Sequence, residues 1–309
     1  DELAALDRAL AHSRTGAAAL VFLHGASGLG RSALLDHFGA ALAGGPAIVL
    51  AGRCHERESV PYKGVDSLID ALAGDLRERP DPEIEALCSP QLHSLARLFP
   101  VLRRVPAIDR VRPGPLDAGL APHEQRQQAF EALRALLGRL AAAGPLVLVL
   151  DDLHWGDVDS AALLRELLRP PDAPALLLIV SYRGDAAASR CIAALRGGLT
   201  PHAGLLRVEL ELRPLTPDSA LELARSLLAD TSRTGEAAAI ARESGGNPLL
   251  IAELCHFSGD ADSRAFAGAP TFEAVLRRRI VRLDPPARAL LEELAATVEA
   301  PPGSSQRSS

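Results

Sequence analysis

A glycine-rich stretch constrains the fold of this chain more than any other feature: Gly25-Ala26-Ser27-Gly28-Leu29-Gly30-Arg31-Ser32. An apolar run precedes it over residues 18–23, and a segment of helical periodicity follows over residues 31–42. In this strand–loop–helix setting the pattern G-x-x-x-x-G-K-[ST] holds a phosphate, because the glycines let backbone N–H groups turn inward and the helix N-terminus adds positive charge. The stretch therefore predicts a phosphate-binding loop in an α/β domain, rather than a glycine-rich turn without function.

The loop supplies most of the predicted nucleotide contacts and departs from the pattern at one position. We expect binding through Gly25, Ser27, Gly28, Gly30, Arg31, Ser32 and Ala33. The Ser32 hydroxyl would also ligate Mg²⁺. Arg31 stands where the pattern has lysine, and a planar guanidinium cannot enter the same gap between phosphates without moving the loop. We therefore expect nucleotide binding to be retained or weakened, and hydrolysis to be slow or absent.

A second signal is an apolar strand candidate that ends in two carboxylates, Leu146-Val147-Leu148-Val149-Leu150-Asp151-Asp152. One carboxylate at such a tip can hold Mg²⁺, usually through water, and the next can orient or activate the attacking water. We assign Asp151 to the metal and Asp152 to catalysis. The alternative is that Asp152 and Asp157 cap the helix that follows.

Arg183 follows a further strand candidate, over residues 176–180. It could sense the γ-phosphate through a charge-assisted contact, and we count it with Asp152 as catalytic. The alternative is a solvated surface arginine. Farther along, Gly245-Gly246-Asn247-Pro248-Leu249 opens a helix with proline near its first position.

Strand candidates alternate with helical segments up to residue 213 and show no hairpin signals, which predicts an α/β fold with a parallel sheet covered on both faces. Ligands of such sheets bind at the carboxyl ends of the strands, here after residues 24, 52, 150 and 181. Residues 80–122 are rich in proline and polar side chains and contain a helical patch at 91–98. They indicate an insertion with weak structure. From residue 214 onward the pattern is helical.

Composition limits the partners. The net charge of −6 argues against a broad basic surface, so we do not expect nucleic acid as a partner of this chain. No apolar run reaches the length of a membrane span, no signal peptide is visible, and the four cysteines lack metal-site spacing, which indicates reduced thiols and a cytoplasmic protein. The chain has no methionine, as expected of a piece of a larger protein, and Lys63 is its only lysine, so coding bias offers a neutral reason for Arg31.

Five stretches resemble the signal-transduction ATPases with numerous domains, the STAND class. They are LVLVLDDLHWGD (146–157), ESGGNPLLIAEL (243–254), GRCHERESVPYKGVDSLIDAL (52–72), LFPVLRRV (98–105) and TFEAVLRRRIVRLDPPARALLEELA (271–295). The first is similar to the acidic-strand motif of the class, the second to its helical-lid signature and the last to the start of its winged helix. The other two resemble bacterial members found behind Ser/Thr protein kinase or nucleotide-cyclase domains, or in LuxR-type transcription regulators.

The resemblance implies a P-loop core with a five-stranded parallel sheet over residues 1–213, a helical lid over 214–257 and the start of a winged helix over 270–299. Residues 300–309 read as a disordered tail. It implies ATP or ADP as ligand, with Pro248 near the adenine, Arg183 as sensor and Asp151 serving Mg²⁺. It also implies a nucleotide-dependent switch that opens and forms a homo-oligomer, linked to effector or sensor domains outside this chain.

Three functions stay open on the sequence. The first is a regulatory ATPase switch. The second is a degenerate nucleotide-binding scaffold whose helices dock other proteins, which Arg31 favours. The third is an origin-recognition-like AAA+ ATPase that binds DNA. Its one basic run is Arg277, Arg278, Arg279 and Arg282, which equally fits a solvated helix face.

Overall fold

The structure is a computed structural model that describes residues 1–56, 61–112, 121–186, 189–199, 204–228, 234–259 and 271–299. The chain divides into two compact units, Asp1–Arg213 and Pro214–Ser309, which we describe separately. The predicted tail, residues 300–309, lies outside the described residues.

Across the described residues, we find no helix with the length and apolar character that a membrane span requires.

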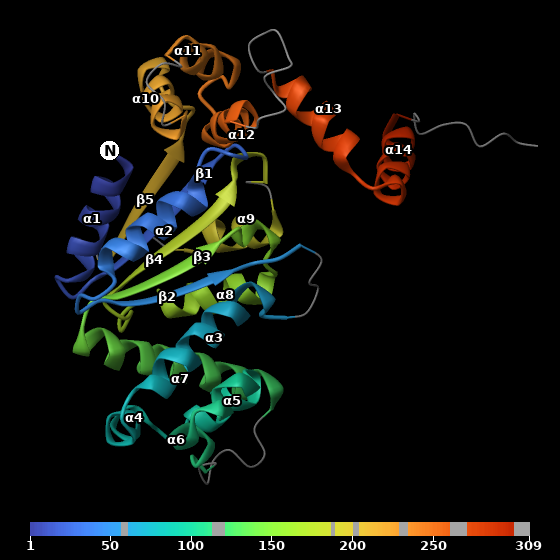
Figure 1. Cartoon of the computed structure of the whole chain (residues 1–309). Helices are drawn as coiled ribbons and strands as arrows, with labels where there is room; N and C mark the ends of the chain where they lie inside the picture. Colours follow the sequence, from blue (N-terminus) through green and yellow to red (C-terminus); the bar gives the residue numbers. More distant parts are fainter. Residues whose placement is uncertain are drawn as a thin grey trace, which may run out of the picture. The chain divides into compact units, whose positions relative to one another are not determined.

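The first unit is built on one sheet of five parallel strands in the order β2-β3-β4-β1-β5 (Figure 1). This confirms the predicted α/β fold with a five-stranded parallel sheet. Strand β4 lies between β1 and β3, so the glycine-rich loop and the acidic tip belong to strands that are not neighbours. The strands are β1 (Ala18–Gly25), β2 (Ile48–Arg53), β3 (Leu146–Asp151), β4 (Leu176–Arg183) and β5 (Leu205–Leu212).

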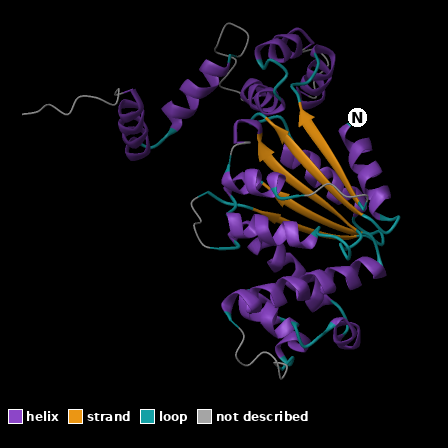
Figure 2. Ribbon diagram, turned by 180° about the vertical axis from the view of Figure 1, so that it is seen from behind, coloured by secondary structure: helices purple, strands orange, loops and turns teal. Residues whose placement is uncertain are grey.

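Alternate residues of the central strands enter two separate cores, as the two-residue period of a strand requires. On β3, Leu148 packs into the larger core and its neighbour Val149 into the smaller one. The smaller core also contains side chains of α1 and α2, and the larger one those of α3, α7, α8 and α9. Helices therefore lie on both sides of the strands (Figure 2), which explains why β3 is apolar up to Leu150 and β4 up to Val180.

The helices that cover this sheet begin and end close to the bounds of the segments with helical periodicity in the sequence. They are α1 (Glu2–Ser13), α2 (Arg31–Leu42), α3 (Lys63–Glu78), α7 (Pro122–Ala143), α8 (Val158–Leu167) and α9 (Arg190–Gly197), together with the short 3₁₀ helices η2 (Leu153–Trp155) and η3 (Gly184–Ala186). Of these six α-helices, α9 is the one that the periodicity of the sequence did not predict.

The prediction that residues 80–122 are weakly structured is wrong for the part that the structure describes. A helical lobe fills residues 81–109 and packs against α3 and α7 (Figure 1). Leu95, Leu102 and Ile108 are almost fully buried in the larger core. Its elements are α4 (Asp81–Leu87), α5 (Leu92–Leu98), η1 (Pro100–Arg104) and α6 (Pro106–Asp109). Residues 113–120 lie outside the description.

Proline misled the sequence prediction for this lobe. Pro80 is the N-cap of α4, while Pro100 and Pro106 each occupy a first helical position. Proline breaks a helix interior but suits its first turn, where no intrahelical N–H bond is lost. A run of prolines therefore marked the starts of several short helices.

If the lobe belongs to the core, Leu95→Ala should destabilise the chain by about 2–5 kcal/mol, since it removes a fully buried side chain and leaves a cavity. Urea unfolding measures the change. The exposed neighbour Arg103 supplies the control, and Arg103→Ala should stay within about 0.5 kcal/mol of the parent. Equal, small effects from both substitutions would show that the lobe contributes nothing to the core.

The second unit is helical in its described residues. Three of its helices share a small core that includes Ala224, Ile240 and Leu254. Several apolar side chains of the last two helices are exposed, among them Val281 and Leu290. The helices are α10 (Pro217–Leu228), α11 (Thr234–Glu243), α12 (Pro248–Gly259), α13 (Phe272–Arg282) and α14 (Pro285–Glu299). The assignments to a lid and a winged helix stay predictions.

Candidate nucleotide-binding site

The glycine-rich loop leaves the sheet at the end of β1 and enters α2 at Arg31. Gly28 and Gly30 have φ angles of 82° and 89°, the left-handed region that favours glycine. Gly25 is needed for another reason, because a Cβ there would lie 2.8 Å from the backbone oxygen of Leu212 on β5. The loop thus has the backbone that the phosphate-binding pattern requires.

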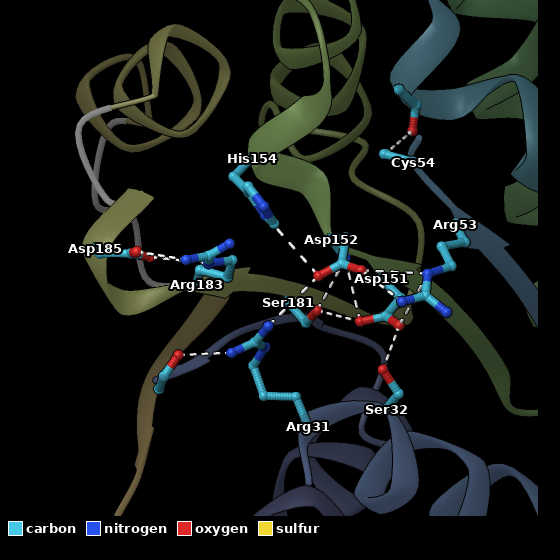
Figure 3. A network of polar contacts seen from close by, with 12 residues as sticks. Arg31, Ser32, Arg53, Cys54, Asp151, Asp152, His154, Ser181, Arg183 and Asp185 are labelled. Carbon is cyan, nitrogen blue, oxygen red and sulfur yellow. Dashed lines mark hydrogen bonds and ion pairs between the residues drawn. The ribbon is translucent and has the colours of Figure 1, made fainter. Parts of the chain in front are cut away.

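Parallel pairing brings the predicted residues to one edge of the sheet. Gly25 is in register with Arg183 on β4, and Asp151 is in register with Arg53 on β2. The side chains of Asp151, Asp152 and Arg53 meet those of Ser32 and Arg31, from the start of α2, in one polar network (Figure 3). Within the first unit, every predicted site residue therefore lies on the loop, at the start of α2 or at this edge.

Asp151 is buried within the network, with 9% of the residue exposed. One of its carboxylate oxygens accepts a hydrogen bond from the Ser32 hydroxyl at 2.7 Å. The other accepts from the Ser181 hydroxyl and from the backbone N–H of Asp152, the latter at 3.1 Å. A hydroxyl and a carboxylate side by side form an oxygen donor set of the kind Mg²⁺ prefers, so Ser32 and Asp151 fit the metal that we expected them to hold.

The side chains alone do not supply a complete set of metal ligands. Among the described residues, no group of three or more His, Cys, Asp and Glu side chains could hold a metal ion. A metal at Ser32 and Asp151 would therefore complete its coordination with phosphate oxygens and water, as Mg²⁺ commonly does.

Arg31 lies folded over the loop. Its Nη1 donates to the backbone oxygens of Gly25 at 2.6 Å and Ala26 at 3.0 Å, while Nη2 is 3.5 Å from a carboxylate oxygen of Asp152. Only 11% of the side chain is exposed. The guanidinium thus bonds to carbonyls of the loop itself and to the second acidic residue.

Asp152 faces positive charge on both carboxylate oxygens. Oδ2 accepts from Nη2 and Nε of Arg53 at 2.8 and 3.2 Å, and Oδ1 faces Arg31 and, at 4.0 Å, Nδ1 of His154. Its backbone has a φ of 56°, which is uncommon outside glycine. Its side chain does not cap the helix that follows.

The alternative that both acids cap a helix is correct for one of them. Asp157 is the N-cap of α8 and accepts from the backbone N–H of Ser160 at 2.8 Å. Asp152 points into the polar network instead (Figure 3). The capping interpretation holds for Asp157 alone.

Arg53 and Ser181 belong to the network but were not among the predicted residues. Arg53 ends β2 and Ser181 lies near the end of β4, at two of the four strand ends where ligand contacts were expected. The expectation located the right edge, yet it gave no reason to choose an arginine or a serine there. Their partners on β3 become visible only once the strand order is known.

Arg183 lies at the same edge but outside this network. Its guanidinium forms a two-pronged ion pair with Asp185, at 2.7 and 3.1 Å, and 42% of the side chain is exposed. A nucleotide phosphate would have to compete with Asp185 for it. Its role as a γ-phosphate sensor stays a prediction.

His154 lies next to Asp152, with its Nδ1 4.0 Å from a carboxylate oxygen of that residue, and both of its ring nitrogens lack a hydrogen-bond partner in the structure. Burial lowers the pKa of its imidazole below 6.5, against the opposing effect of the nearby Asp152 carboxylate. The ring packs against Trp155 at a centroid distance of 4.7 Å. The imidazole is therefore neutral at pH 7.

Two thiols near the site are chemically quiet. Burial raises the pKa of Cys54 and of Cys191 to about 12, so neither forms a thiolate at neutral pH. Cys54 donates to the backbone oxygen of Gly64 at 3.2 Å. Both side chains serve as packing groups.

Pro248 opens α12 in the second unit, where Asn247 caps the helix by accepting from the backbone N–H groups of Leu249 and Leu250. Its expected place near the adenine stays a prediction.

Comparison with known proteins decides the family. Residues 1–180, more than half of the chain, match the family described as AAA ATPase domain. The chain belongs to this family. It is thus a P-loop, nucleotide-binding AAA module, a family that uses nucleotide and usually Mg²⁺.

Other comparisons add little about this AAA module. The Aeropyrum pernix ORC2 protein, in its ADPNP–ADP complexes, is 12% identical with a TM-score of 0.45, covering 91% of this chain and 67% of that one. The Drosophila ORC bound to GC-rich DNA and Cdc6 is 14% identical with a TM-score of 0.29, covering 95% and 85%. Both TM-scores lie below 0.5, and neither likeness says what this chain binds. A search of curated proteins found no match.

The buried imidazole gives the AAA module a pH dependence of stability. The pKa of His154 in the folded chain lies below its ordinary 6.5, so the unfolded chain binds a proton at this group more readily than the folded chain does. Stability therefore falls as pH drops below about 6.5. The slope attributable to this group is at most about 1.4 kcal/mol per pH unit. Urea unfolding between pH 5 and pH 7.5 should show a shallower slope for His154→Gln than for the parent. An unchanged slope would contradict the assignment.

Proposed function

We propose that this AAA module is an ATP/ADP-binding regulatory switch of a larger bacterial signalling protein of the STAND class, in which hydrolysis is weak or absent. The observation that carries the proposal is the position of Arg31, whose guanidinium bonds to the carbonyls of Gly25 and Ala26 and faces Asp152. The guanidinium carries the positive charge needed to hold a phosphate, but its N–H groups point at the carbonyls of the loop.

Binding of Mg²⁺-nucleotide is supported by the loop and the acidic tip together. Gly28 and Gly30 adopt the left-handed backbone of the loop, and α2 points its N-terminus toward the same place. Ser32 and Asp151 lie within hydrogen-bonding distance, where one cation could bridge them to a phosphate. We infer that Arg31 swings toward the phosphates when nucleotide binds and releases the loop carbonyls.

Slow hydrolysis is supported by the surroundings of Asp152. A general base must reach a water molecule with a free carboxylate oxygen. Arg53 holds one oxygen at 2.8 Å, and the other faces Arg31 and His154. Even after Arg31 moves toward the phosphates, Arg53, whose side chain is 57% exposed, would still pair with the carboxylate and compete with the proton of the attacking water.

The switch itself would consist of different positions of the second unit in the ATP and ADP states. A ligand shifts such an equilibrium only by its difference in affinity for the two states. Fluorescent ATP and ADP should therefore bind the purified chain with different dissociation constants, and small-angle scattering should differ between the two complexes. Equal affinities without a change in scattering would contradict the switch.

Arg31→Lys tests the reason given for slow hydrolysis. A lysine ammonium is compact enough to reach between phosphates, so phosphate release should rise at least about tenfold, with little change in nucleotide affinity. The exposed Arg8 on α1 provides a matched control, and Arg8→Lys should leave the rate unchanged. A parent rate within a few-fold of the Arg31→Lys rate would contradict this prediction.

A degenerate scaffold is the second candidate, and the same position of Arg31 favours it. Here nucleotide would be a permanent structural ligand. Denaturing the purified chain and identifying the released nucleotide separates the candidates. A scaffold predicts ADP or ATP that does not exchange over hours, while a switch predicts exchange.

The structure gives no support to DNA binding through the basic run on α13. Arg277 pairs with Glu273 at 2.7 Å, and Arg279 pairs with Glu253 on α12. Both partners lie within the second unit and offset the charge that phosphates would need. We therefore do not propose DNA as a ligand of this chain.

A further inference from the structure

A cavity of about 380 Å³ opens on the first unit between α5 and α7, and none of its lining residues belongs to the glycine-rich loop. Its volume falls within the roughly 300–1,000 Å³ typical of small-molecule sites. The side chains that matter below are Tyr62, Arg97, Leu98, Arg126 and Asp159, all in the described part of the chain.

The cavity carries positive charge on an acidic protein. Two guanidinium groups and one carboxylate line it, a formal charge of +1 (two minus one), whereas the whole chain has −6. Arg126 is 4.0 Å from Asp159, at the outer limit of an ion pair. Arg97 is exposed and forms no hydrogen bond or ion pair with any other described residue. The charge therefore suits an anion.

An apolar wall faces this charge. Tyr62 is 8% exposed, and its ring packs edge-on against Phe99 and Phe130, each at a centroid distance of 5.8 Å. Leu98 and Pro122 complete the wall. A ligand with an apolar body and one anionic group would use both sides of the cavity.

Tyr62 also connects the cavity to the acidic tip of β3. Its backbone has a φ of 67°, a conformation uncommon for an aromatic residue. Its N–H donates to Asp157 at 3.1 Å, and the N–H of Gly64 donates to the same carboxylate at 3.2 Å. A Cβ on Gly64 would lie 3.0 Å from the Cα of Gly156, so the start of α3 presses directly on the turn that follows Asp152.

We propose that this cavity binds a small organic anion, a carboxylate or phosphate monoester with an aromatic or aliphatic body, and that its occupation changes nucleotide affinity at the glycine-rich loop. The second part rests on the proposed function, because it requires the loop to bind nucleotide. A ligand that moves Tyr62 must also move Asp157 or break its hydrogen bonds, and that carboxylate ends the turn carrying Asp152 and His154.

Binding is tested with benzoate and phenyl phosphate by calorimetry or ligand-observed NMR, with benzyl alcohol as the neutral control. We expect saturable binding of at least one anion, weakened at least about tenfold by Arg97→Gln and by Arg126→Gln. Arg8→Gln, the same charge change on α1, should leave it intact. Phenyl phosphate is measured again with saturating ADP, which separates the cavity from the glycine-rich loop.

Three results would overturn the site: no saturable binding of either anion, equal binding of benzyl alcohol, or binding that Arg97→Gln and Arg126→Gln leave unchanged. The coupling is tested by the dissociation constant of ADP with and without the anion that binds. We expect a change of at least about threefold in the parent and none in Arg97→Gln. An unchanged ADP affinity would overturn the coupling. Failure of ADP to bind at all would instead contradict the proposed function, while the benzoate measurement still decides the cavity.

Discussion

The carboxylate of Asp151 organises the site. It lies at the end of β3 and accepts hydrogen bonds from Ser32 on α2, from Ser181 on β4 and from the next backbone N–H. These bonds join three elements that are far apart in the sequence. A buried carboxylate needs such donors, because an unpaired charge there would be strongly destabilising. The strand order makes these contacts possible, since β4 must lie beside β3 to place Ser181 next to Asp151.

Around this carboxylate, arginine rather than lysine sets the electrostatics. Arg31 and Arg53 approach Asp152 from α2 and β2, and both use the several donors of a guanidinium. Lysine could match neither arrangement with a single ammonium. The result is an edge of the sheet where negative charge is already compensated before any nucleotide arrives.

Much of the fold could be predicted because local patterns and the global fold agree. The apolar runs before Gly25 and Asp151 became β1 and β3, and the loop between β1 and α2 has the glycine backbone that its spacing predicts. Within the lobe of residues 81–109, only the helical patch at 91–98, which is α5, could be predicted. The prolines of the lobe resemble helix breakers, and its other helices are too short to show a period.

The site was predictable to the same extent. Residues of the phosphate-binding loop and of the acidic strand end were found, whereas Arg53 and Ser181 belong to neither motif. They reach the site through the pairing of their strands with β3, and no local sequence pattern predicts the order of the strands. Asp152 carries a motif, but its place after a strand and before a helix fitted both a catalytic role and a helix cap. Its contacts to Arg53 and Arg31 were needed to separate the two roles.

The central claim is that Ser32 and Asp151 hold the metal of a bound nucleotide. The most direct measurement is the affinity for ATP with Mg²⁺ and with excess EDTA, in the parent chain and in Asp151→Asn, which keeps the shape of the side chain and removes its charge. We predict that Mg²⁺ tightens ATP binding in the parent and that Asp151→Asn loses at least about tenfold of that gain. The same dependence on Mg²⁺ in both proteins would contradict the account.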